Sequence, residues 1–208
     1  ADLNLTVKKP VFIPRPETEF LVSYACTLVR AADPAPFWIL DLGCGSGNLV
    51  LGLLHALGRA RAVAVDLDLR ALRLACYNAK KFGLENRLHL CQSDFFLGLG
   101  RRHKYPLIVS NPPYIPTAEI NGLQLEVREW ESKIALDGGP DGLDAYRRLL
   151  REGRDYLAPG GDFILEIGYN QAESLAQLAR DNGWELAGIK TDLNNWPRIV
   201  HLKPSPHG

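Results

Sequence analysis

The residues with the clearest chemical potential are Asn111-Pro112-Pro113-Tyr114. Two consecutive prolines fix the backbone φ angle and remove two N–H donors, so this turn is rigid and offers mainly acceptors. The Asn111 side-chain oxygen and the Pro112 carbonyl could each accept one N–H of a planar –NH2 group, against which Tyr114 could stack. Such a nitrogen becomes positive as it attacks an electrophile, so these acceptors would bind it more strongly in the transition state. We predict that Asn111, Pro112 and Tyr114 are catalytic and that all four residues bind substrate, although the motif alone could also be an ordinary turn.

The second motif, Gly43-Cys44-Gly45-Ser46-Gly47, has glycines at alternate positions. It lies between an apolar run at 37–42, typical of a buried strand, and a helical apolar pattern that begins at residue 49. In a strand–turn–helix unit the N–H groups at the start of the helix face a ligand, and glycines let a cofactor approach the backbone. The spacing is not that of a dinucleotide fold, and no Lys-Ser/Thr pair follows as in a phosphate-binding loop. The alternative is that these glycines only close a turn.

Two acidic residues indicate the class of cofactor. Asp66 ends the apolar run 62–65, 19 positions after Gly47, and an acid about 20 residues beyond a glycine loop can accept both hydrogen bonds of a ribose diol. Asp41 lies just before the loop, where its charge would repel a pyrophosphate and attract a sulfonium or ammonium group. These two acids favour S-adenosyl-L-methionine, with S-adenosyl-L-homocysteine as the product, over a dinucleotide.

Two further segments could complete the cofactor site. Asp94 and Phe95 follow a third expected strand, at the sheet edge where α/β folds bind ligands, and could contact the adenine amino group and ring. Arg15 and Thr18 lie in a proline-stiffened loop placed to cover a cofactor, unless it is only a solvated lead-in to a helix. The predicted cofactor-binding residues are Arg15, Thr18, Gly43, Cys44, Gly45, Ser46, Gly47, Asp66, Leu67, Asp94, Phe95 and Asn111. We expect no metal site.

Composition limits the other possibilities. The 208 residues, 46% of them apolar, suit one compact domain. The 24 basic and 24 acidic residues give zero formal net charge, so there is no electrostatic footprint for long nucleic acid. No apolar run approaches the ~20 residues of a membrane span, and no secretory signal pattern is present. The four cysteines show no C-x-x-C spacing, which favours free thiols in a reducing compartment; we expect a cytoplasmic protein.

Alternation of apolar runs and helical patterns predicts an α/β fold with a mostly parallel sheet and helices on both faces. We expect strands at 37–42, 62–66, 86–91, 107–110, 163–167, 184–189 and 198–202, and helices at 18–31, from 49, at 69–82, 143–156 and 171–181. The last two strands lack an intervening helix, which requires an antiparallel hairpin at one edge. We treat 1–208 as a single domain: 1–36 forms a leading segment with a lid-like helix, and 37–208 the core. Within the core, 115–140 has no clear periodicity and is expected to form an irregular substrate rim.

Taken together, these motifs resemble the PrmC/HemK family of N(5)-glutamine methyltransferases. The resembling stretches are Ile13-Pro14-Arg15-Pro16-Glu17-Thr18-Glu19, Asp41-Leu42-Gly43-Cys44-Gly45-Ser46-Gly47, Ala64-Val65-Asp66, Asn111-Pro112-Pro113-Tyr114-Ile115, and the segment from Glu126-Val127-Arg128 to Asp137-Gly138-Gly139-Pro140-Asp141-Gly142-Leu143. The last segment is more specific than the shared methyltransferase core. The resemblance runs from about residue 8 to residue 203. It departs at Phe95, where some members carry tryptophan.

This resemblance implies a Rossmann-like class I S-adenosylmethionine-dependent methyltransferase with a seven-stranded sheet. It also implies methylation of the glutamine side-chain amide in the Gly-Gly-Gln motif of class-1 peptide-chain release factors. Family members usually carry an N-terminal helical domain that helps to hold the release factor, and this chain begins almost at the catalytic domain. It is therefore expected to be either a fragment or a short homologue.

Two alternatives stay open at this point. Adenine N6 methylation of DNA or RNA would suit the same Asn-Pro-Pro-Tyr motif, but the neutral charge and the lack of a base-recognition domain count against it. A non-catalytic cofactor-binding module is the other alternative, against which the intact Asn111 and Asp66 argue. We expect a monomer that acts on a protein, with no direct nucleic-acid or membrane partner.

Overall fold

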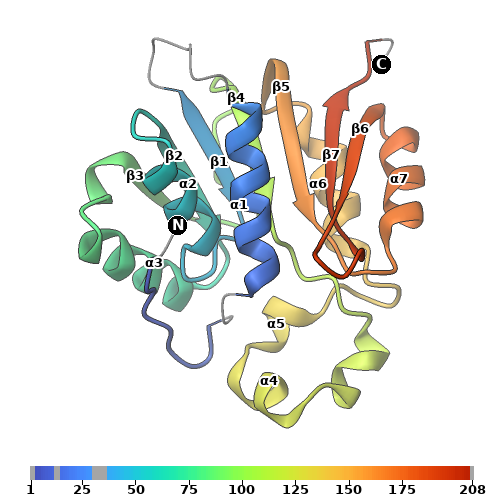
Figure 1. The fold of residues 1–208 in the computed structure, drawn as a ribbon, viewed down its shortest axis with the longest axis horizontal. Helices are drawn as coiled ribbons and strands as arrows, with labels where there is room; N and C mark the ends of the chain where they lie inside the picture. Colours follow the sequence, from blue (N-terminus) through green and yellow to red (C-terminus); the bar gives the residue numbers. More distant parts are fainter. Residues whose placement is uncertain (1–2, 12–14, 30–36, 207–208) are drawn as a thin grey trace.

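The computed structural model describes residues 3–11, 15–29 and 37–206. Within these residues a seven-stranded sheet has the order β3-β2-β1-β4-β5-β7-β6 (Figure 1). Its strands are β1 (Trp38–Leu42), β2 (Arg61–Asp66), β3 (Leu88–Gln92), β4 (Tyr105–Ser110), β5 (Leu157–Glu166), β6 (Trp184–Thr191) and β7 (Pro197–Pro204). The pairs among β1 to β5 are parallel, whereas β7 is antiparallel to both β5 and β6. This arrangement confirms the predicted parallel sheet with an antiparallel edge hairpin.

Helices cover both faces of the sheet because strand residues alternate between two apolar layers. In β1, Ile39 belongs to the layer packed by α1, α2 and α3, and Leu40 to the layer packed by α6 and α7. Figure 1 shows α1 crossing the front of the sheet, with α6 behind it. The helical segments are α1 (Pro16–Leu28), α2 (Asn48–Ala56), α3 (Leu69–Lys81), η1 (Glu85–Arg87), η2 (Thr117–Gly122), α4 (Leu125–Trp130), α5 (Lys133–Leu136), α6 (Asp144–Gly153) and α7 (Ala172–Asp181).

Some predicted boundaries are wrong, for identifiable reasons. The rim at 115–140 is not irregular: it contains η2, α4 and α5, each of at most six residues and so too short to display a 3.6-residue period. Strand β5 begins at Leu157 rather than at residue 163 and includes the glycine pair at 160–161; the register with β4 shifts there. Helix α1 begins at Pro16 rather than at Thr18, since proline suits the first helical position. The end predicted for this helix, about residue 31, lies outside the described residues.

Helix α1 is packed into the core, where Leu21 and Ala25 are fully buried. A lid-like role for this helix stays a prediction, and only its first turn lies beside the cavity described below.

The parallel pairing of β1 with β4 sets the position of both motifs. Leu42 lies opposite Ser110 in this register. The buried Ser110 hydroxyl donates a hydrogen bond of 2.6 Å to the Leu42 carbonyl. The glycine turn and the Asn111–Tyr114 turn, which we call the substrate corner, therefore leave the sheet side by side.

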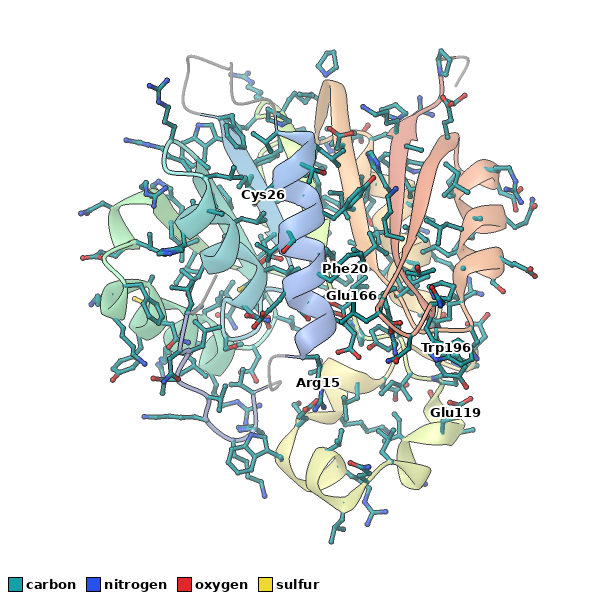
Figure 2. The ribbon with its side chains drawn as sticks, in the orientation of Figure 1. Arg15, Phe20, Cys26, Glu119, Glu166 and Trp196 are labelled. Carbon is teal, nitrogen blue, oxygen red and sulfur yellow. The ribbon has the colours of Figure 1, made fainter. Side chains whose placement is uncertain are left out.

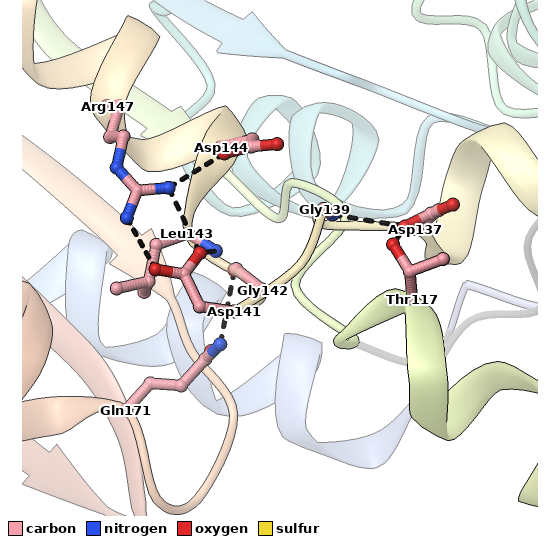
Figure 3. A network of polar contacts seen from close by, with 9 residues as sticks. All are labelled: Thr117, Asp137, Gly139, Asp141, Gly142, Leu143, Asp144, Arg147 and Gln171. Carbon is pink, nitrogen blue, oxygen red and sulfur yellow. Dashed lines mark hydrogen bonds and ion pairs between the residues drawn. The ribbon is translucent and has the colours of Figure 1, made fainter.

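The substrate corner is held in place by the turn at 138–142 and by Gln171. Figure 3 shows the side chain of Gln171 reaching Gly142 of this turn. The Gln171 amide donates to the carbonyls of Tyr114, at 2.9 Å, and Gly142, at 3.2 Å, while its oxygen accepts from the Gly168 N–H. A Cβ at Gly138 would lie only 2.8 Å from the Tyr114 Cα, and one at Gly142 would clash with the Tyr114 carbonyl. Glycines are needed here because two backbone segments touch.

We predict that Gly142→Ala lowers the free energy of unfolding by on the order of 2–4 kcal/mol. The added methyl group would strike the Tyr114 carbonyl and would also strain a φ of +75°. Gly160→Ala is the matched control: its φ is +74°, but nothing lies within 4 Å of its Cβ, so the variant should cost only about 1 kcal/mol. Urea unfolding measures both, and equal losses would show that contact with Tyr114 is unimportant.

Candidate active site

A cavity of about 490 Å³ opens at the carboxyl ends of β1, β2, β3 and β4, where ligands bind in open α/β sheets. Its lining includes every predicted site residue except Gly47: Arg15, Thr18, Gly43, Cys44, Gly45, Ser46, Asp66, Leu67, Asp94, Phe95, Asn111, Pro112, Pro113 and Tyr114. Gly47 instead sits at the N-cap of α2 with a φ of 91°, and a Cβ there would press on Leu51 and Ala75. The structure thus brings the two motifs together, and the individual roles of the residues stay predictions.

Asp66 is attached directly to the glycine turn. One carboxylate oxygen accepts from the Gly45 N–H and the other from the Asp68 N–H, each at 2.8 Å. Burial raises the pKa of Asp66, and these two hydrogen bonds oppose the shift. Each oxygen keeps a second lone pair, so the carboxylate can still accept two hydroxyl groups.

Asp41 is the least satisfied polar group near the turn. Its carboxyl group is fully buried, and neither oxygen has a hydrogen-bond partner among the described residues. Burial, with the charge of Asp66, raises the pKa of Asp41 to about 8; the Val50 N–H offsets this slightly without completing a hydrogen bond. Asp41 does not line the cavity, so its charge would favour a positively charged ligand from a distance rather than by contact.

Asp94 and Phe95 share a neighbour that the sequence did not indicate. Both carboxylate oxygens of Asp94 accept from the Arg148 guanidinium, at 2.8 and 2.9 Å. The same guanidinium lies 5.1 Å from the centre of the Phe95 ring. Phe95 also has a φ of 49°, a left-handed conformation that costs a non-glycine residue about 1–2 kcal/mol. The predicted adenine contacts of Asp94 and Phe95 would therefore form beside Arg148.

Arg15 and Thr18 have partners within the protein. Arg15 forms a 2.6 Å ion pair with the buried Glu131 of the rim, and Figure 2 shows it below the first turn of α1. The Thr18 hydroxyl donates to Glu166 at 2.9 Å. Both residues line the cavity. The cofactor contacts predicted for them stay predictions, but their bonds to Glu131 and Glu166 brace the rim and the substrate corner.

Asn111 and Tyr114 lie next to a second buried acid, Glu166, at the end of β5. The Asn111 side-chain nitrogen is 3.4 Å from the Thr18 hydroxyl. Burial raises the pKa of Glu166 to about 7, while hydrogen bonds from Thr18 and Asn111 favour its charged form. Burial also raises the pKa of the Tyr114 phenol, with the Glu166 charge adding to the effect. Tyr114 therefore stays neutral and offers an aromatic surface rather than a base.

Comparison with known proteins identifies the family. A family model described as the methyltransferase small domain matches residues 25–125. The chain is 46% identical over 182 residues to a release factor glutamine methyltransferase of Moorella thermoacetica, covering 87% of this chain and 62% of that protein. It is 43% identical over 207 residues to the protein of that name from Bradyrhizobium diazoefficiens, covering 98% and 69%. The chain belongs to the release factor glutamine methyltransferase family.

A solved structure supports the same family. The release factor-specific protein-(glutamine-N5) methyltransferase of Alicyclobacillus acidocaldarius is 27% identical, with a TM-score of 0.55, over 93% of this chain and 95% of that one. The chain spans 62% of the length of the Moorella relative and 69% of the length of the Bradyrhizobium relative. The fold is thus that of a class I methyltransferase, whose methyl donor is S-adenosyl-L-methionine.

The residues of this methyltransferase fit that donor. The open space over Gly45, where a Cβ would meet nothing within 4 Å, leaves room against the backbone. The free lone pairs of Asp66 suit a ribose diol, and the unpaired Asp41 suits a positive charge. Among the described residues, no group of His, Cys, Asp or Glu is arranged to hold a metal ion. The described helices include none that could span a bilayer.

Several supporting residues were not predicted from the sequence. They are Asn78, Arg148, Glu166 and Gln171, which act through contacts distant along the chain. Asn78, fully buried on α3, donates to the Ser46 carbonyl and exchanges two hydrogen bonds with the backbone of Thr6. The only available signal was an amide or a charged residue within an otherwise apolar or helical pattern, which does not specify a partner.

We expect Asp66→Ala to weaken S-adenosylmethionine binding about 10- to 100-fold, because the charged acceptor for the ribose would be lost. Asp155→Ala is the control, since that exposed acid lies at the opposite ends of the strands, beside the start of β4, and its carboxylate pairs with Arg101. Isothermal titration calorimetry measures both affinities. Unchanged affinity in the Asp66 variant would refute the ribose assignment.

Asp41 should make stability depend on pH. Because its pKa is higher in the folded protein than in the unfolded chain, the stabilisation is complete below about pH 4 and is lost as the pH rises towards about 8. Asp41→Asn should therefore be more stable than the parent at pH 8.5, by roughly 1–3 kcal/mol, and nearly equal at pH 4. Denaturant unfolding at both pH values, without cofactor, tests this; parallel pH curves would contradict it.

Proposed function

We propose that this protein methylates the side-chain amide nitrogen of the glutamine in the Gly-Gly-Gln motif of class-1 peptide-chain release factors. We also propose that it acts as a cytoplasmic monomer, without direct contact to nucleic acid. The single observation that carries the proposal is that the substrate corner and the glycine turn with Asp66 line one cavity. The family relatives, which are named for this reaction, support it.

The lining of the cavity suits a side chain that ends in a flat amide. Beyond the substrate corner it reaches the apolar residues Leu123, Val127 and Ile134 of the rim. The rim is fixed there by the Arg15–Glu131 ion pair and by a hydrogen bond from the Ser132 N–H to the Pro10 carbonyl. Apolar walls suit the methylene groups of glutamine, and the acceptors of the corner suit its –NH2 group.

Each protein group has a defined task in the proposed reaction. When bound, S-adenosylmethionine supplies an electrophilic methyl group on a positively charged sulfur. The Asn111 oxygen and the Pro112 carbonyl accept the two N–H groups of the substrate amide, and Tyr114 supports its plane. The nitrogen lone pair would form the new N–C bond as the bond between the methyl group and sulfur breaks, so positive charge would grow on the nitrogen between the two acceptors. The surplus proton then leaves the nitrogen for solvent, and alignment alone can lower the barrier by on the order of 7–11 kcal/mol.

The test is methyl transfer from labelled S-adenosylmethionine to a purified release factor, with an adenine-containing oligonucleotide in a parallel reaction. We expect label on the release factor only, and none when the Gly-Gly-Gln glutamine is replaced by alanine. Asn111→Ala should retain cofactor affinity by calorimetry and lose turnover by a factor of about 100 or more.

Two other outcomes would contradict the proposal. Label on the oligonucleotide alone would establish an adenine methyltransferase, and cofactor binding without any transfer would indicate a non-catalytic module. If Asn111→Ala weakened cofactor binding as much as turnover, the role of Asn111 would be different from the one proposed.

A further inference from the structure

We propose that Glu166 is a positioning residue which, acting through Thr18, decides which end of the Asn111 amide faces the substrate. The inference rests on the proposed function, because only a substrate with N–H donors needs the oxygen end. Glu166 does not line the cavity, so its effect must pass through other groups.

The sheet places these residues together. In the parallel pairing of β4 with β5, Ser110 lies opposite Leu165, so Asn111 and Glu166 leave adjacent strands at the same level. The first turn of α1 crosses this edge and contributes Thr18, which is 2% exposed. Figure 2 shows Glu166 beside α1. Glu166 itself is 1% exposed, so water does not compete for its oxygens.

The chain of hydrogen bonds has a direction. A carboxylate can only accept, so the single hydroxyl hydrogen of Thr18 is committed to Glu166, at 2.9 Å. The Thr18 oxygen then presents only lone pairs to Asn111, and its neighbour at 3.4 Å is the amide nitrogen, which donates. The Asn111 side chain also interacts with Glu166 directly and favours its charged form, which requires the same donating end. With the –NH2 end of Asn111 turned to both groups, its oxygen is left for the cavity.

The opposite orientation of the Asn111 amide is disfavoured both at Thr18 and at the substrate. The two ends of an asparagine amide have nearly the same size, so packing alone does not distinguish them and hydrogen bonding must. A reversed Asn111 would direct its oxygen at the Thr18 lone pairs and present N–H groups to the N–H groups of the substrate. A charged Glu166 therefore keeps the productive acceptor in place before substrate arrives.

Protonation of Glu166 should remove the preference for the orientation of Asn111 in which its –NH2 group faces Thr18. The groups that face Glu166 are Glu17 and Thr18 on α1, Arg198 on β7, Tyr114 after β4, and Tyr146 on α6, which donates to the Glu166 carbonyl. Arg198 is itself shared with Glu17 and Asp192. Burial and the charge of Glu17 place the pKa of Glu166 at about 7. Once protonated, the carboxyl group becomes a donor, which frees the Thr18 hydroxyl to turn towards Asn111.

The first experiment measures kcat and KM against pH for methylation of the release factor by the parent protein and by Glu166→Gln. For the parent we expect kcat to fall about tenfold per pH unit below pH 7, while the KM for S-adenosylmethionine stays constant. Glu166→Gln should lower kcat about tenfold at pH 8 and abolish the acid limb, because glutamine has no charge to lose. An unchanged kcat and an unchanged acid limb in this variant would overturn the proposal, as would a flat parent profile.

The second experiment does not depend on the Glu166 variant being folded. With S-adenosylmethionine saturating for each variant, Thr18→Val should have a kcat about tenfold below that of Thr18→Ser, which keeps the hydroxyl. Equal activity of the two variants would contradict the proposal.

A third readout needs no turnover. In the cofactor-free parent, the side-chain amide resonances of Asn111 in a ¹⁵N NMR spectrum should shift with a midpoint near pH 7, and Glu166→Gln should remove that shift. A pH-independent resonance in the parent would overturn the inference. If the parent fails to methylate a release factor at any pH, the proposed function fails instead, and the NMR titration still decides on Glu166.

Discussion

The site depends on the parallel register between β1 and β4. Because Leu42 lies opposite Ser110, the turns that follow these strands begin side by side, one rich in glycine and the other in proline. The buried hydrogen bond from the Ser110 hydroxyl reinforces this register. A slip by one residue would exchange the two faces of a strand and place its apolar side chains in the wrong layer. The two apolar layers therefore protect the geometry of the cavity as well as the stability of the sheet.

Three acidic residues lie at the edge where this cavity opens: Asp41 and Glu166 are buried, and Asp66 is half-buried. Burial raises the pKa of each, so each lowers the stability of the protein at neutral or alkaline pH. A protein optimised for stability alone would carry neutral groups here. In our interpretation each acid has a task that a neutral group could not perform: attracting a positive charge, accepting a diol, and giving direction to an amide.

The parts of the site that could be predicted are those in which residues adjacent in the sequence are sufficient to indicate the chemistry. The glycine turn, Asp66 after its strand, and the prolines after Asn111 each suggest a chemistry from a few consecutive positions, and the alternation of strands and helices placed them at one sheet edge. Contacts between distant segments could not be predicted: Thr18 and Glu166 are 148 positions apart, and Tyr114 and Gln171 are 57 apart. Short helices such as α5, with four residues, leave no periodic pattern. Hydrogen-bond partners are set by tertiary packing, which residue types alone do not determine.

The buried amide of Asn78 joins the cofactor turn to the beginning of the described chain. Of its three hydrogen bonds, two go to the backbone of Thr6 and one to the Ser46 carbonyl. Trimming the chain beyond residue 6 would leave that amide without two partners in a dry environment, although every strand of the sheet would still be present. A shortened version could therefore fold and yet hold its nucleoside loosely, so the practical boundary of a minimal enzyme lies ahead of its first secondary-structure element.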